Sequence, residues 1–159
     1  MKFFKNALIL LAVLSFPILA FSSDKTELNL WKRNANLYGP CGHCADFVNF
    51  SENENRKDFS EFNLYDQDGY YTVNLTGSTG TMVTLYGNKG FDTDHGYLVI
   101  VKKDDRMVEV EDLEGFTPGQ WVDINTQEGS YSAFYRPNQN FKTRVASVKW
   151  GKWWTGSNP

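Results

Sequence analysis

The chain has 159 residues, a formal net charge of −3 and an aromatic content of 16%. This acidic balance argues against nucleic acids and anionic membrane surfaces as partners, because both reward a clustered positive surface. The aromatic residues, interleaved with threonine and valine, favour half-buried pleated strands over helices. A chain of this length suits one hydrophobic core.

The N-terminus has the three parts of an export signal. Lys2 and Lys5 form a positive beginning, residues 7–16 are apolar, and Ala20-Phe21-Ser22 offers small residues for cleavage. The apolar run is too short for a bilayer, which needs about 20 residues. We therefore expect a signal peptide over 1–22, one β-rich domain over 23–159, and a secreted or periplasmic protein without membrane insertion. Cleavage would leave 14 basic and 19 acidic residues, a net charge of −5.

Short apolar or alternating runs, separated by turn residues such as Asp68-Gly69, predict strands through most of the chain. Their number and spacing are typical of an all-β Greek-key sandwich or small barrel. One short helix at most is expected, from Cys44 to about Phe62, where four apolar side chains could share a face; the polar centre of this segment, residues 51–57, fits a solvated loop equally well. The expected strands are Leu28–Lys32, Tyr70–Leu75, Met82–Tyr86, Tyr97–Lys102, Met107–Val110, Trp121–Ile124, Tyr131–Tyr135 and Arg144–Trp150.

Cys41 and Cys44 form a CxxC pair, which in an exported protein can be a disulfide, a redox pair or part of a metal site. A redox pair of the thioredoxin type belongs in a βαβ unit, and no such periodicity surrounds it. A tetrahedral zinc site needs four ligands, and the only histidines available are His43 and His95. The favoured interpretation is a disulfide between Cys41 and Cys44, with no metal site.

A second interpretation uses Cys44 as a nucleophile. Thiol catalysis needs a thiolate, an imidazole within reach and a third group that orients the imidazole. Cys44 opens the expected helix and His95 precedes an expected strand about 50 residues later. This order is similar to that of small papain-like peptidases and amidases of bacteria. The resemblance implies Cys44 and His95 as the catalytic pair, with Glu109 or Glu111 as the orienting group.

Acidic residues gather in several expected turns, and Asp92 and Asp94 are one such pair. Calcium takes six to eight oxygen ligands, often from clustered carboxylates. Aspartate is also an ordinary turn residue. No cofactor is favoured, and calcium at Asp92 and Asp94 is kept as an alternative.

Trp153 and Trp154 follow the last expected strand, beyond Gly151. Two tryptophans at that position can cap the end of the β-structure, or they can form an exposed aromatic patch for a partner. Both interpretations stay open, and Trp153 and Trp154 are the candidate partner-binding residues.

Residues 85–91, Leu-Tyr-Gly-Asn-Lys-Gly-Phe, resemble the opening hairpin of a βγ-crystallin Greek-key unit. In that family the strand ends in an aromatic residue, and a second aromatic five residues later packs across the hairpin. The closing strand of that unit carries a serine flanked by valine or isoleucine residues. Residues 144–148, Arg-Val-Ala-Ser-Val, resemble such a strand. The resemblance covers about residues 82–150 and implies a Greek-key fold in a family that includes secreted inhibitors. Lys142 and Thr143 stand where a calcium-binding member would have Asn or Asp.

The sequence therefore favours an exported, non-catalytic binding domain, of the inhibitor or immunity-protein kind, with a protein or carbohydrate partner outside the cytoplasm. Its first alternative is a papain-like thiol peptidase or amidase that uses Cys44 and His95. Its second is a calcium-tuned structural protein of the crystallin type.

Overall fold

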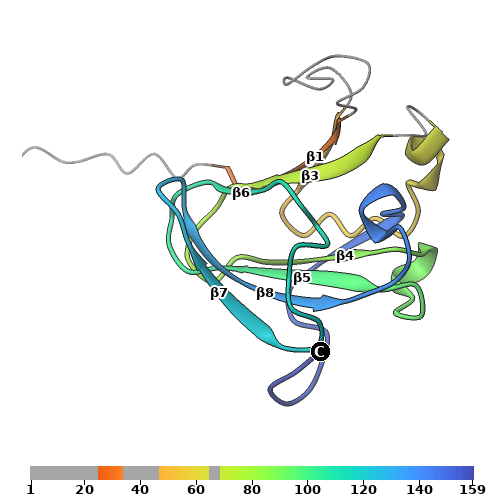
Figure 1. Ribbon diagram of the computed structural model, residues 1–159. Coiled ribbons are helices and arrows are strands. Elements are labelled where there is room, and N and C mark those ends of the chain that lie inside the picture. The colour runs from red at the N-terminus through yellow and green to blue at the C-terminus, as the bar shows by residue number, and fades with distance from the viewer. Residues whose placement is uncertain (1–24, 34–46, 65–68) are drawn as a thin grey trace, which may run out of the picture.

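Two antiparallel β-sheets lie face to face in the computed structural model, which describes residues 25–33, 47–64 and 69–159 (Figure 1). The four-stranded sheet has the order β2-β1-β3-β6, and the five-stranded sheet has the order β7-β8-β5-β4-β9. The predicted all-β sandwich is confirmed. The strands are β1 Glu27–Arg33, β2 Phe47–Ser51, β3 Tyr70–Leu75, β4 Met82–Tyr86, β5 Tyr97–Lys102, β6 Val108–Val110, β7 Trp121–Asn125, β8 Ser130–Arg136 and β9 Ser147–Trp150.

The main core lies between the sheets and is built by alternation along each strand. Successive side chains of a strand point to opposite faces, so every second residue can enter the core. Leu28 and Leu30 of β1 are fully buried there, as are Val83 and Leu85 of β4. The same alternation in the sequence explains why the predicted bounds of β3, β4 and β5 equal the observed ones.

No α-helix forms in residues 47–62, the described part of the segment where a helix or a solvated loop was expected. Residues 47–51 form β2, which pairs antiparallel with β1, and only a short 3-10 helix, η2 (Ser60–Leu64), follows. Phe50 and Phe59 are buried in the core with ring centroids 5.2 Å apart. A short apolar run fits a strand as well as a helix, and here pairing with β1 decides the conformation.

The hairpin between β4 and β5 is fixed by Ser147 at the start of β9. The buried Ser147 hydroxyl donates to the carbonyl of Asn88 at 2.6 Å and accepts from the N–H of Phe91 at 3.1 Å. Phe91 closes the 3-10 helix η3 (Lys89–Phe91) with a φ of 65°, a left-handed conformation that is uncommon for a bulky residue. Its ring packs 5.8 Å from that of Tyr86, centroid to centroid. The expected strand Arg144–Trp150 begins only at Ser147, because residues 141–143 form the 3-10 helix η4 (Phe141–Thr143).

Two lysines are buried at opposite ends of β3. The ammonium of Lys32 donates to the carbonyl of Gly69 at 3.2 Å and lies 4.9 Å from the centre of the Tyr71 ring. The ammonium of Lys102 donates to the carbonyls of Leu75 and Arg106. Burial lowers the pKa of Lys102, because a charged ammonium is poorly solvated there. Backbone carbonyls thus satisfy both ammonium groups at the ends of the core.

Candidate binding cleft on the outer face of the five-stranded sheet

A second apolar cluster lies on the outer face of the five-stranded sheet, where a two-layer sandwich normally meets water. Tyr86, Tyr97 and Phe134 occupy outward positions on β4, β5 and β8, and all three are at least 96% buried. Trp121 of β7 joins them, with its ring centroid 5.5 Å from that of Phe134. Aromatic side chains therefore continue across four neighbouring strands.

The C-terminal segment 151–159 covers this aromatic face. Gly151 turns the chain after β9 with a φ of 76°, a conformation that glycine adopts without a steric penalty. Trp153 then packs its ring 5.9 Å from Tyr86 and 5.5 Å from Tyr97, and its indole N–H donates to the Thr84 hydroxyl at 2.9 Å. Trp153 thus covers the sheet, which is the capping role that the sequence left open.

Trp154 is held differently from Trp153. Its ring centroid lies 6.0 Å from that of Trp121 and 5.7 Å from that of Trp153. The indole nitrogen of Trp154 is buried and has no hydrogen-bond partner among the residues that the structure describes. Most buried polar groups are paired, so this N–H is one of the few exceptions among the described residues.

Trp121 and Trp154, whose ring centroids are 6.0 Å apart, together line a cleft of about 410 Å³ between the sheet and the C-terminal segment. The Trp121 indole N–H donates to the carbonyl of Ser157 at 3.0 Å and so ties the segment to β7. Lys152 places its ammonium 5.4 Å from the Trp154 ring centre. The cleft is lined by Met82, Val101, Lys103, Trp121, Asp123, Ser132, Lys152, Trp154, Gly156 and Ser157.

Asp123 supplies the carboxylate of the cleft. It accepts a hydrogen bond from the Ser132 hydroxyl, and the Lys103 ammonium lies 3.9 Å from the same oxygen. The Asp123 side chain is 71% exposed, so its second oxygen remains open to a ligand. Apolar walls with a few convergent polar groups are typical of sites that bind small molecules or peptides.

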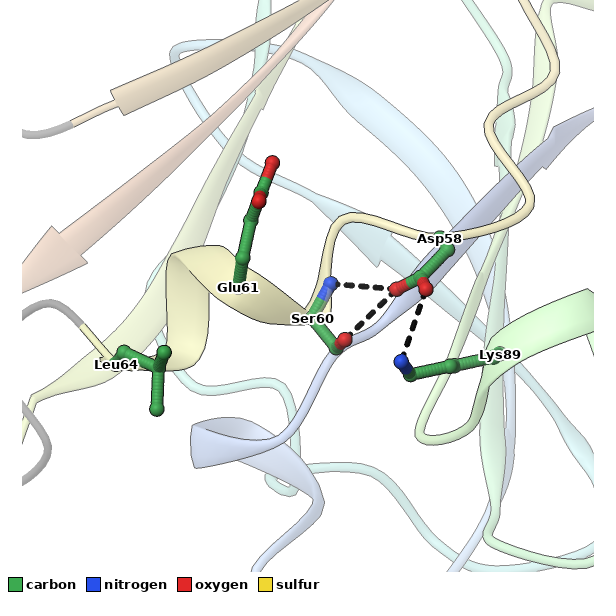
Figure 2. A pocket seen from close by; sticks show the side chains of 5 residues that line it. All are labelled: Asp58, Ser60, Glu61, Leu64 and Lys89. Carbon is green, nitrogen blue, oxygen red and sulfur yellow. Dashed lines mark hydrogen bonds and ion pairs between the residues drawn. The ribbon is translucent and has the colours of Figure 1, made fainter.

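Figure 2 shows a different hollow, of about 440 Å³, beside η2. Asp58 there accepts from Lys89 at 2.9 Å and from the backbone N–H and hydroxyl of Ser60 at 2.9 and 2.7 Å. These bonds, first that from Lys89, lower the pKa of Asp58 to about 2. Asp58 and Lys89 are paired with each other, and the described residues that line this hollow include no aromatic side chain (Figure 2), which makes it a weaker candidate than the aromatic cleft.

Of the predicted thiol site, the structure describes only the histidine and the two candidate glutamates. Cys41, His43 and Cys44 lie outside the described residues, so the disulfide and the nucleophile both stay predictions. His95 is exposed in the turn before β5. Glu109 belongs to β6, in the other sheet, and pairs with Arg33 at 3.3 Å. Glu111 is exposed just after that strand.

The proposed calcium ligands Asp92 and Asp94 lie in the same turn before β5. Asp92 accepts from the N–H of Asp94 and from the side-chain amide of Asn88, each at 2.9 Å. These two hydrogen bonds lower the pKa of Asp92. Within residues 25–33, 47–64 and 69–159, no three histidine, cysteine or acidic side chains are grouped as metal ligands. The contacts present are those of an ordinary aspartate turn.

The sequence indicated part of this cleft and missed the rest. Trp154 was a candidate binding residue and does line the cleft, whereas Trp153 packs on the sheet. Trp121 and Asp123 were placed correctly in a strand but were not recognised as site residues. The available signal was their spacing, because residues two apart share one face of a strand.

The fold and the cleft define an all-β sandwich with an aromatic-lined hollow on one outer face. Comparison with protein-family models, with curated proteins and with solved structures finds no match to this chain. No helix in the described segments is long and apolar enough to cross a membrane.

Proposed function

We propose that this protein is an exported, non-catalytic binding domain that holds its partner at the Trp121–Trp154 cleft. The observation that carries the proposal is the cleft itself, which is lined by two indole rings and an exposed carboxylate. Tryptophan is enriched among residues that dominate binding energy, particularly in well-packed pockets. An inhibitor or an immunity protein would use such a surface to hold a protein, and a lectin-like domain would use it to hold a carbohydrate.

The test compares Trp154→Ala with Trp31→Ala. Trp31 lies in β1, in the opposite sheet, so its removal leaves the cleft intact. The purified domain is screened against displayed random linear peptides and against a glycan array, and the dissociation constant of the best ligand is measured for each variant.

We expect Trp154→Ala to weaken binding at least about tenfold, the size of a strong single contact, and Trp31→Ala to leave it within about twofold. Circular dichroism of both variants checks that they are folded. Equal binding by wild type and Trp154→Ala would refute the cleft as the partner site.

The crystallin-type alternative has one supporting observation of its own. The Tyr86 and Phe91 rings pack across the β4–β5 hairpin, and Ser147 of the closing strand binds the same hairpin. We keep a βγ-crystallin-like unit over about residues 82–150 as a proposal on this basis. It is compatible with a binding function, since the aromatic cleft lies on the same sheet.

A further inference from the structure

Strand β7 is an edge strand of the five-stranded sheet, and it borders the cleft. Among the described residues it pairs only with β8, in the register Trp121↔Phe134 to Asn125↔Ser130. On the other side of its backbone, the described part of the chain places no strand. Such an edge presents a row of N–H and C=O groups on which another chain can pair.

The direction of each backbone group in β7 follows from its neighbours. In β8, the Tyr135 carbonyl accepts from the N–H of Gly119 on the β7 side, whereas the Ser130 carbonyl accepts from the N–H of Lys103 on the β5 side. Residues 131, 133 and 135 of β8 thus bond towards β7. In the register, Tyr131 lies opposite Ile124 and Ala133 lies opposite Val122.

Backbone groups alternate in direction along an antiparallel strand. Because Val122 and Ile124 bond to β8, the N–H and C=O groups of Trp121, Asp123 and Asn125 point to the open edge. The side chains of Trp121 and Asp123 also line the cleft. One set of residues therefore offers both an unpaired backbone row and the side chains of the candidate site.

The opposite edge of the same sheet shows how this protein closes an edge with its own chain. The N–H of Arg56 donates to the carbonyl of Val148 in β9, and the N–H of Val148 donates back to the carbonyl of Arg56, each at 2.9 Å. The N–H of Phe59 adds a bond to the carbonyl of Ala146 at 2.9 Å. No such segment from the described part of the chain pairs with β7.

We propose that an extended peptide segment of a partner protein pairs with the open edge of β7 and places one side chain in the Trp121–Trp154 cleft. This inference rests on the proposed binding function and names the ligand class. Peptides are commonly recognised by addition to a sheet edge, with backbone bonds giving affinity and pockets giving specificity for alternate side chains.

The cleft also specifies the peptide's chemistry. Residues directly opposite each other in a strand pair have Cβ atoms about 4.5–5.5 Å apart. An apolar or aromatic peptide residue opposite Trp121 would lie against the two indole rings. A polar residue two positions away would lie opposite Asp123, whose carboxylate already has the Lys103 ammonium 3.9 Å away. A carbohydrate cannot supply N–H and C=O groups that alternate at strand spacing, so the edge favours a polypeptide.

The experiment separates the backbone contact from the side chain by comparing Asp123→Pro with Asp123→Ala. Both variants lose the carboxylate and its bond to Ser132, but only proline also removes the outward N–H. Proline is tolerated on edge strands where the N–H faces away from the ladder, so β7 should still pair with β8. The probe is the best binder selected from random linear peptides displayed on phage.

We expect Asp123→Pro to bind that peptide about tenfold more weakly than Asp123→Ala. The proline variant loses one backbone hydrogen bond to the peptide and leaves one peptide carbonyl without a partner. Amide hydrogen exchange of the wild type, which needs no variant, gives a second readout. The amides of Trp121, Asp123 and Asn125 should exchange fast in the free protein and become protected when the peptide is bound.

Each contrary outcome is informative. Peptide binding could need Trp154 and yet leave these amides unprotected and be equal for the two Asp123 variants. That result would overturn edge pairing and leave the binding function standing. A glycan ligand sensitive to Trp154→Ala, with no selected peptide, would overturn the peptide class alone. Dimerisation of the wild type that Asp123→Pro abolishes in sedimentation would assign the edge to a second copy. Absence of any Trp154-dependent ligand would overturn both proposals.

Discussion

Ser147 is the residue whose loss should most directly loosen the hairpin between β4 and β5. Its side chain is fully buried, and its hydroxyl is bonded both to the carbonyl of Asn88 and to the N–H of Phe91. Ser147→Ala removes both bonds and supplies no replacement. The neighbouring strand β9 keeps its own backbone pairing with β4, so the effect should be centred on the hairpin.

The expected cost follows from the two backbone groups left without a partner. An unsatisfied buried polar group costs about 1–3 kcal/mol, and these two are only partly buried, so we take about 1–1.5 kcal/mol for each. Phe91 also keeps its left-handed conformation, which the serine helps to hold. The free energy of unfolding should therefore fall by about 2–3 kcal/mol, which lowers the melting temperature by about 10 °C in a domain of this size.

The assay is urea unfolding followed by tryptophan fluorescence, with Ser130→Ala as the matched control. Near the surface, the Ser130 hydroxyl accepts from Arg106 at 3.2 Å and also bonds the Asp104 carboxylate; both partners keep other hydrogen bonds, so its replacement should cost less than about 0.5 kcal/mol. The midpoint should shift for Ser147→Ala while the slope stays unchanged. A loss below about 0.5 kcal/mol, or one equal to that of Ser130→Ala, would refute the argument that Ser147 holds the hairpin.

Two further predictions concern pH. Hydrogen bonds, first that from Arg106, lower the pKa of Asp104 from 3.8 to about 2, so its stabilising effect is complete above pH 3.8 and is lost as the pH falls towards 2. Asp104→Asn should flatten the acid fall in melting temperature, and an unchanged slope would contradict this. Burial lowers the pKa of Lys102 below 10.5, so the unfolded chain binds more protons and this group makes stability rise as the pH approaches 10.5. Lys102→Met should remove that rise, measured as the difference in urea midpoint between variant and wild type at several alkaline pH values, and a constant difference would contradict it.

The strands were predictable from the sequence because side chains alternate between the two faces of a strand. The same alternation therefore sets the apolar pattern in the sequence and the side chains that enter the core. In β4 and β5, apolar side chains fill the core positions, and Gly and Asn mark the turn between the strands. The register of the pair, from Met82↔Val101 to Tyr86↔Tyr97, keeps these apolar positions on the core face. This alternation is local and can be read from the sequence, whereas the loop between the two strands is held by Ser147 of the distant strand β9.

The stretch after residue 46 was not predictable in the same way. Its apolar residues Val48, Phe50 and Phe59 fit a helical face and a strand face about equally well, and the polar residues between them favour neither. The structure resolves the ambiguity through partners that are distant in sequence, because β2 pairs with β1 and residues 56–59 bond to β9. Pairing between distant segments leaves no periodic signal.

The sequence indicated only part of the candidate site, again because contacts between distant residues decide the rest. Trp153 and Trp154 stand out as a pair near the end of the chain, but nothing local distinguishes the one that packs on Tyr86 and Tyr97 from the one that faces Trp121. The distinction depends on the turn at Gly151, which sends the chain back across the sheet.

The C-terminal segment 151–159 both covers the sheet and forms part of the cleft wall. A substitution in this segment can therefore weaken binding in two ways. Trp153 fastens the segment to the sheet through Thr84 and two aromatic rings, and Trp154 next to it forms the cleft wall. Replacing Trp153 would therefore free Trp154 as well, and lost binding would not separate a contact from a displaced wall. Variants at Asp123 avoid this difficulty, because they keep both tryptophans and the backbone pairing of β7 with β8. A binding loss confined to the proline variant at that position would have to come from the edge of the sheet.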